Sequence, residues 1–134
     1  EMEFSYRKSI VEKENYIVLR VGITLNKGNQ SEIDARMADL ASKRKAKQPL
    51  HLPSAGSTFK RPTGYFAGQL IEESGLRGYS LGGAQVSELH CGFIVNKDNA
   101  TAKDVYDLIR HVQNVVYDKF EIRLDTEVKM IGDF

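Results

Sequence analysis

The first pattern along the chain is an alternation of side chains over residues 16–25. The apolar positions fall on every second residue: Ile17, Leu19, Val21, Ile23 and Leu25. A period of two is typical of a half-buried strand, because successive side chains point to opposite faces of the sheet. The pattern therefore predicts a β-strand over residues 16–25.

Helical spacing follows over residues 32–48. Ser31, with Asp34 three residues later, suits a helix start, since a hydroxyl can accept a backbone N–H and the helix dipole favours an acid there. The apolar positions on one face are Ile33, Met37, Leu40 and Ala41. Basic residues fill the last turn and Pro49 ends it, so we predict a helix over residues 32–48.

The middle of the chain begins with residues 49–62, which follow neither period and hold all three prolines. We expect a structured loop or linker there. A short amphipathic helix is predicted from Phe66 to Ile71, with Gly75 in the position that closes it. Short strands are predicted at residues 79–81, 84–87 and 91–95, with the Gly82-Gly83 pair as a turn.

The strongest helix signal opens at Thr101, with Asp104 three residues on. Its apolar residues have three- and four-residue spacing: Val105, Leu108, Ile109, Val112, Val115, Val116 and Phe120. A final strand is predicted over residues 122–130, where apolar and charged residues take opposite faces.

The order of these elements lacks regular βαβ alternation, so we predict the α+β class: a small mixed sheet with packed helices. Residues 1–15 carry no helix or strand start of their own. Such an abrupt beginning is typical of a chain cut from something longer.

Composition narrows the function classes. With 134 residues, 28% charged and 41% hydrophobic, the chain has ordinary globular composition and room for one ordinary domain, or for one domain plus a piece of another. A net charge of +1 gives no overall attraction to nucleic acid, and the apolar runs are too short for a membrane span. The single cysteine, Cys91, excludes a disulfide scaffold and favours the cytoplasm.

Metal and thiol chemistry are not expected. The three histidines, His51, His90 and His111, have no ligand spacing with one another or with Cys91, so no metal site is predicted. Cys91 lies in an apolar run, where a buried, inert thiol is the common outcome.

The loop around Ser57 is the best candidate site. Small residues at 54–58 let a ligand approach the backbone closely, and Lys60 and Arg61 add two positive charges suited to an anion. A simple connector with solvated basic residues is an equal alternative on composition alone. A serine hydroxyl such as that of Ser57 can pass a proton to a carbanion where neighbours stabilise the oxyanion.

Two distant residues are further candidates. Glu127 lies in the charged face of the predicted last strand, where a solvated or ion-paired residue is the default. Arg7 has the planar fork that suits a carboxylate, although a lone arginine is more often a surface residue.

Six short runs add a more specific signal. They are FSYRKSI at 4–10, AGSTFKRP at 55–62, AGQLIEESGLRG at 67–78, GGAQVS at 82–87, NKDNAT at 96–101 and LDTEV at 124–128. In this order they resemble the UDP-N-acetylenolpyruvoylglucosamine reductase family, and the resemblance covers residues 4–132.

The resemblance implies a cytoplasmic flavoenzyme of peptidoglycan synthesis. In that family NADPH reduces FAD, which gives a hydride to the enolpyruvyl group of UDP-N-acetylglucosamine enolpyruvate. The family's FAD site lies mostly in an N-terminal region that nothing here matches. We therefore expect residues 1–48 to be the tail end of an FAD-binding domain and residues 49–134 to be the C-terminal substrate-binding domain, inactive in isolation.

The resemblance also implies residue roles. Arg7 would contact the enolpyruvyl carboxylate, Ser57 would protonate the substrate carbon, and Glu127 would complete the catalytic set. The residues implied in binding are Lys47, Arg61 and His90 for substrate and Gly56 for the cofactor. The alternatives are a stand-alone nucleotide-sugar binding module without redox activity, and a structural remnant that binds nothing.

Overall fold

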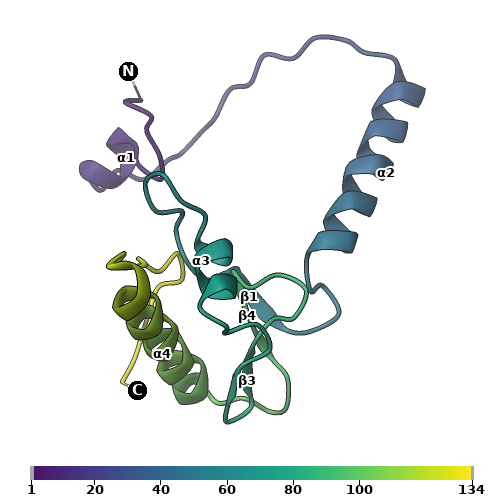
Figure 1. The fold of residues 1–134 in the computed structure, drawn as a ribbon. Coiled ribbons are helices and arrows are strands. Elements are labelled where there is room, and N and C mark those ends of the chain that lie inside the picture. The colour runs from purple at the N-terminus through teal and green to yellow at the C-terminus, as the bar shows by residue number, and fades with distance from the viewer. Residues whose placement is uncertain (1, 134) are drawn as a thin grey trace. The chain divides into compact units, whose positions relative to one another are not determined.

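A computed structural model describes residues 2–133 (Figure 1). Contacts divide the chain into two units, one ending at Ala35 and one beginning at Arg36. The helices are α1 (Ile10–Lys13), α2 (Gln30–Lys47), α3 (Ala67–Glu73) and α4 (Ala102–Phe120). The strands are β1 (Ser54–Ser57), β2 (Ser80–Leu81), β3 (Ala84–Val86) and β4 (Phe93–Asn96).

The sheet has the strand order β1-β4-β3-β2, and these three pairings are antiparallel. The predicted α+β class is confirmed, although we expected a mixed sheet. Short connections explain the difference, since β2, β3 and β4 follow one another closely and a parallel pair needs a long crossover. The Gly82-Gly83 turn joins β2 to β3, and Gly82 has φ 54.

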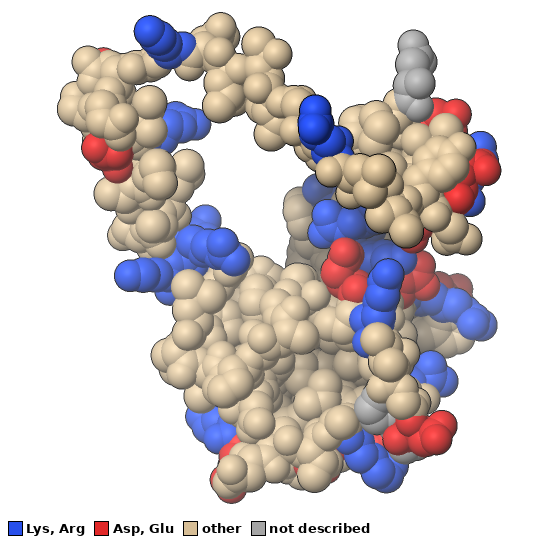
Figure 2. Space-filling view, turned by 180° about the vertical axis from the view of Figure 1, so that it is seen from behind, with Lys and Arg blue, Asp and Glu red and all other residues tan. Residues whose placement is uncertain are grey.

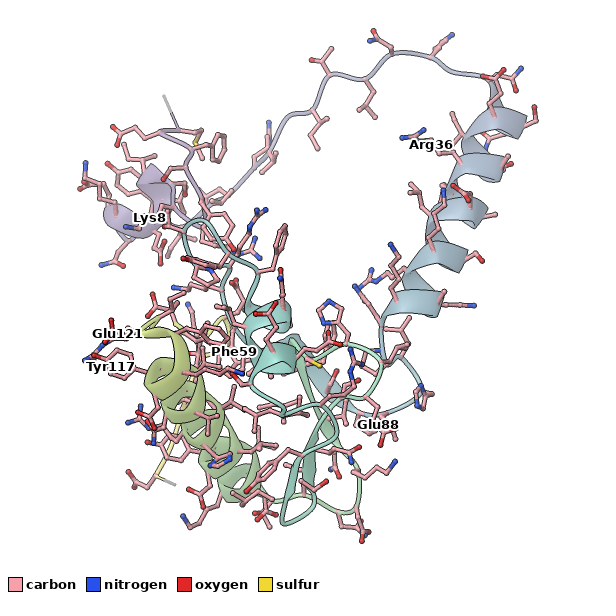
Figure 3. The ribbon with its side chains drawn as sticks, in the orientation of Figure 1. Lys8, Arg36, Phe59, Glu88, Tyr117 and Glu121 are labelled. Carbon is pink, nitrogen blue, oxygen red and sulfur yellow. The ribbon has the colours of Figure 1, made fainter. Side chains whose placement is uncertain are left out.

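The core lies between the sheet, α3 and α4. Helix α4 begins as predicted, because the Thr101 hydroxyl accepts the Asp104 N–H and the Asp104 carboxylate accepts the Thr101 N–H. Its buried residues are Leu108, Ile109, Val112 and Val116. Leu70 and Ile71 of α3 belong to the same cluster, and Phe59 lies between the two helices (Figure 3).

Helix α2 confirms the predicted helix with its start shifted. Asn29, rather than Ser31, caps its first turn, because the Asn29 Oδ1 accepts the N–H of Ser31 at 3.0 Å. None of its residues is buried. Within residues 2–133, no helix combines the length and apolar character that crossing a membrane requires.

The predicted strand over residues 16–25 is absent. Its apolar residues are exposed, with Leu19 at 92%. A strand needs a neighbour to complete its hydrogen bonds, and none of the described residues pairs with this segment. The alternation of apolar and polar residues over 16–25 suits a strand, but no neighbouring strand pairs with this segment among the described residues.

Three further predictions need correction. Residues 122–130 form no regular strand, because their one bridge joins Phe59 to Thr126 and pairing stops there. Residues 49–62 are not all loop, since β1 lies within them. Helix α1 lies within residues 1–15, where we expected no element. The Ser9 side chain makes no cap hydrogen bond, so the helix has no capping signal of the kind that the sequence could show.

Candidate functional site

A β-bulge places Ser57 at the end of β1. Ser54 pairs with Val95 and Ser57 pairs with Phe93, so β1 uses one more residue than β4 between these two pairs. Gly56 lies in the bulge with φ 89, a conformation that glycine adopts without strain. Ser57 is exposed where β1 ends.

Thr58 is the residue at which the chain changes partners. Its N–H donates to the Gly92 oxygen at 2.8 Å, and its own carbonyl accepts the Glu127 N–H at 2.8 Å. Its hydroxyl is buried and accepts the Ile94 N–H at 3.1 Å. The chain therefore leaves β4 and pairs next with the C-terminal segment.

The next residues complete this change. Phe59 bridges Thr126, and the Lys60 N–H donates to the Asp125 oxygen at 2.8 Å. The backbone of Glu127 is thereby bonded to the residue that follows Ser57, although the two residues are far apart in sequence. Glu127 is half-buried, and Ser57 is exposed to solvent.

His90 borders the same place. Its Nδ1 accepts the Gly92 N–H at 3.0 Å, so the proton of the neutral ring lies on Nε2. A Cβ built on Gly92 would lie 2.9 Å from the His90 Cε1 and 3.6 Å from the Ser57 Oγ. The imidazole and the hydroxyl therefore flank Gly92. The Ser87 hydroxyl supports the turn by accepting the His90 N–H at 3.3 Å.

Arg61 follows closely along the chain and is held in place. Its guanidinium lies 4.0 Å from the centre of the Phe66 ring, and its Nε donates to the Tyr65 oxygen at 3.3 Å. The middle of the larger unit is uncharged on the face that Figure 2 shows, with lysines and arginines mostly at its margin. On that face, attraction of an anion depends on individual cations rather than a broad positive surface.

Two predicted site residues are not brought to Ser57 by any contact described above. Lys47 is exposed at the last position of α2. Arg7 belongs to the first unit, where it has φ 57 and lies 5.2 Å from the centre of the Tyr6 ring. The structure describes Arg7 within its own unit only.

The Cys91 thiol is not suited to act as a nucleophile in this site. The side chain is buried, and burial raises the pKa of its thiol, which Arg77 partly offsets. Among the described residues, no three histidine, cysteine, aspartate or glutamate side chains gather as metal ligands would.

Sequence reasoning missed Thr58 and Gly92. Thr58 stood inside the small-residue run, but nothing in that run indicated that its hydroxyl would be buried. Gly92 carried no motif, and only the structure shows that a Cβ there would displace the His90 ring.

Comparison with known proteins gives consistent matches. The family model described as "UDP-N-acetylenolpyruvoylglucosamine reductase, C-terminal domain" matches residues 48–131. The UDP-N-acetylenolpyruvoylglucosamine reductase of Clostridioides difficile is 59% identical over 99% of this chain. That of Caldanaerobacter subterraneus is 56% identical over the same share. The chain covers 44% of the length of each of these relatives.

A solved structure extends the match to the fold. The crystal structure of UDP-N-acetylenolpyruvylglucosamine reductase from Thermus caldophilus superposes with a TM-score of 0.77 and 41% identity. The match covers 96% of this chain and 45% of that protein.

Proposed function

Because this chain belongs to the UDP-N-acetylenolpyruvoylglucosamine reductase family, we propose that it is the C-terminal part of such a reductase. The full-length protein would reduce UDP-N-acetylglucosamine enolpyruvate to UDP-N-acetylmuramate with NADPH and FAD, in cytoplasmic peptidoglycan synthesis. Residues 1–48 would end the FAD-binding domain and residues 49–134 would form the substrate-binding domain. The observation that carries the proposal is the backbone bond from Glu127 to Thr58, which attaches the segment holding Glu127 next to Ser57.

Ser57 would donate the proton in this reaction. A hydride added to one carbon of the enolpyruvyl double bond leaves negative charge on the neighbouring carbon and the carboxylate, which a proton must quench. The Ser57 hydroxyl is exposed at the end of a strand whose position the bulge fixes. Its role needs a neighbour that stabilises the oxyanion left after transfer.

The other site residues would bind and orient the substrate. Arg7 would contact the substrate carboxylate, and Glu127 would complete the catalytic set near the double bond. His90 presents Nε2–H as a donor, because its Nδ1 already accepts the Gly92 N–H. Arg61 would meet the diphosphate, and its stacking on Phe66 would reduce the side-chain entropy lost on binding. Lys47 would also contact the UDP part.

FAD fits the described residues at one point. A Cβ at Gly56 would meet no atom within 4 Å, so the backbone there is open to close approach by a flat ring. The sequence has no G-x-G-x-x-G run for a dinucleotide diphosphate. We therefore infer that Gly56 touches the flavin and that most of the FAD site lies outside this chain. When bound, FAD would supply the hydride.

The decisive experiment separates the two half-reactions in the full-length protein. Ser57→Ala should leave flavin reduction by NADPH unchanged and slow reoxidation by the enolpyruvyl substrate about 10²- to 10⁴-fold, since proton donation belongs to the second step alone. Stopped-flow absorbance of the flavin measures both rates.

A matched control is Ser80→Ala, in β2 at the opposite edge of the sheet. The Ser80 hydroxyl accepts the Gln85 Nε2–H at 3.1 Å, and that amide keeps its other bond, to the Gly78 oxygen at 3.0 Å. Both half-reactions should keep wild-type rates in this variant. Equal slowing of both half-reactions by Ser57→Ala would contradict the proton-donor role.

The second candidate function is a nucleotide-sugar binding module without redox activity, favoured by the preoriented guanidinium of Arg61. We expect UDP-N-acetylglucosamine enolpyruvate to bind the 134-residue chain only weakly, because Arg7 and Ser57 lie in separate units. Isothermal titration measures this affinity. Sub-micromolar binding that Arg61→Ala abolishes would favour the binding module over the reductase.

A further inference from the structure

Thr58 has a buried hydroxyl at the centre of the site, although no role above requires one. Its relative exposure is 3%, and it is one of three polar residues buried among those described. A valine of the same shape would satisfy the packing there without a polar atom. What the hydroxyl adds over a methyl group is a hydrogen bond: it accepts the Ile94 N–H at 3.1 Å.

That bond changes how firmly β1 is attached to β4 beyond the bulge. Two bonds then join Thr58 to the β4 side of the sheet: its own N–H donates to the oxygen of Gly92, just before β4, and its hydroxyl accepts the N–H of Ile94 within β4. A bulge disrupts the regular ladder, so the side-chain bond adds a second attachment where the ladder is weakest. The two bonds, at positions two residues apart, constrain both the place and the orientation of Thr58.

The Thr58 carbonyl accepts the Glu127 N–H, so this fixed residue also holds the C-terminal segment. Ser57 lies one residue before it and is exposed, with no buried packing of its own to fix it. A displacement of Thr58 would move Ser57 and Glu127 relative to His90, which is attached to Gly92.

We propose that Thr58 is a positioning residue, whose hydroxyl holds the bulged end of β1 against Ile94 and so sets Ser57 for proton transfer. This inference rests on the proposed function for its chemical consequence, but the hydrogen bond itself is independent of it.

The first test follows the hydrogen bond in the 134-residue chain. Amide hydrogen exchange of Ile94 should accelerate about tenfold in Thr58→Val and stay near the wild-type rate in Thr58→Ser, which keeps the hydroxyl. An Ile94 amide that exchanges at the wild-type rate in Thr58→Val overturns the proposal.

The second test follows the chemistry in the full-length protein. Thr58→Val should slow flavin reoxidation by substrate about tenfold to a hundredfold while flavin reduction by NADPH is unchanged, because small misplacements of a reacting group are costly. Thr58→Ser should restore most of the rate. Slowing of both half-reactions, or no rescue by serine, overturns the proposal.

The matched control is Ser74→Ala. Ser74 also has a hydroxyl bonded to the backbone, donating to the Leu70 oxygen at 2.7 Å at the end of α3. If this variant slows reoxidation as much as Thr58→Val, general loosening of the domain explains the effect and the proposal fails. A wild-type protein without reoxidation by the substrate would refute the proposed function, while the Ile94 amide still decides the role of the Thr58 hydroxyl.

Discussion

Gly83 shows how tightly single residues are constrained around the β2–β3 turn. A Cβ built there would overlap the Asp98 carbonyl oxygen and lie 2.5 Å from the Ala100 nitrogen. The Gly83 carbonyl also accepts the N–H groups of Lys97 and Asp98 at 2.9 and 3.1 Å. These neighbours are backbone atoms, so they cannot turn aside as a side chain could.

We expect Gly83→Ala to destabilise the chain by about 1–3 kcal/mol, the usual cost of overpacking. Urea unfolding followed by circular dichroism measures this change. Gly22→Ala is the control, because a Cβ at Gly22 would meet no atom within 4 Å, and it should change the free energy of unfolding by less than about 0.5 kcal/mol. Equal stability of the two variants would show that the turn can relax.

At the residue scale the candidate site was only partly predictable. The sequence indicates Ser57, Glu127 and His90 as candidates, but the bonds that link their segments run through Thr58 to Gly92 and Glu127, which are distant in the chain. Local patterns carry no information on such contacts. Thr58 was missed for the same reason, since its hydroxyl matters only because Ile94 faces it.

The three longer helices, α2, α3 and α4, were the elements best predicted from sequence. Helix α4 carries its own start signal in Thr101 and Asp104, and helix α3 is followed by Gly75 with φ 76. These signals lie within a few residues of the helix ends, so they can be recognised without knowing the tertiary contacts of the helix. Strands depend on a partner, which explains why residues 16–25 and 122–130 form no regular strand, whereas β3 and β4 form close to the predicted 84–87 and 91–95, with shifted ends.

The Asp104 cap predicts a pH dependence of stability. Hydrogen bonds from the Thr101 backbone and hydroxyl, and then from the Gly83 N–H, hold the pKa of the Asp104 carboxyl below its ordinary value. A carboxyl with a lowered folded-state pKa stabilises the fold above its unfolded pKa, and this stabilisation is lost as pH falls through the folded value.

We therefore expect Asp104→Asn to unfold at lower urea than wild type at pH 7, with the difference shrinking as the pH falls below the ordinary aspartate range. Urea midpoints measured at pH 7, 4 and 3 follow the difference. A gap that stays constant over this range would show that the charge of Asp104 adds nothing to the cap.

The whole molecule consists of two units of unequal packing. The buried apolar cluster belongs to the unit that begins at Arg36, whereas residues 16–25 leave their apolar side chains exposed. Proteases cut where the backbone is exposed and unpaired. This segment holds Arg20, and Lys27 follows it before α2.

We expect trypsin to cleave the 134-residue chain first after Arg20 and Lys27, leaving a resistant product that keeps α3, α4 and the sheet. Mass spectrometry over a time course identifies the first products. In the full-length protein these sites should be cleaved more slowly if other strands pair with residues 16–25. Early cleavage within β3, β4 or α4 would contradict the expected order.

The bulge decides on which surface of the sheet the Ser57 side chain lies. If the same residues formed a regular ladder from the Ser54–Val95 pair, Ser57 would lie opposite Gly92 and its side chain would point to the other surface, because side chains alternate along a strand. The bulge keeps Ser57 opposite Phe93, and Gly56 reaches the bulged conformation with φ 89. A residue at position 56 that resists this φ would therefore favour the regular ladder and take the hydroxyl to the wrong surface.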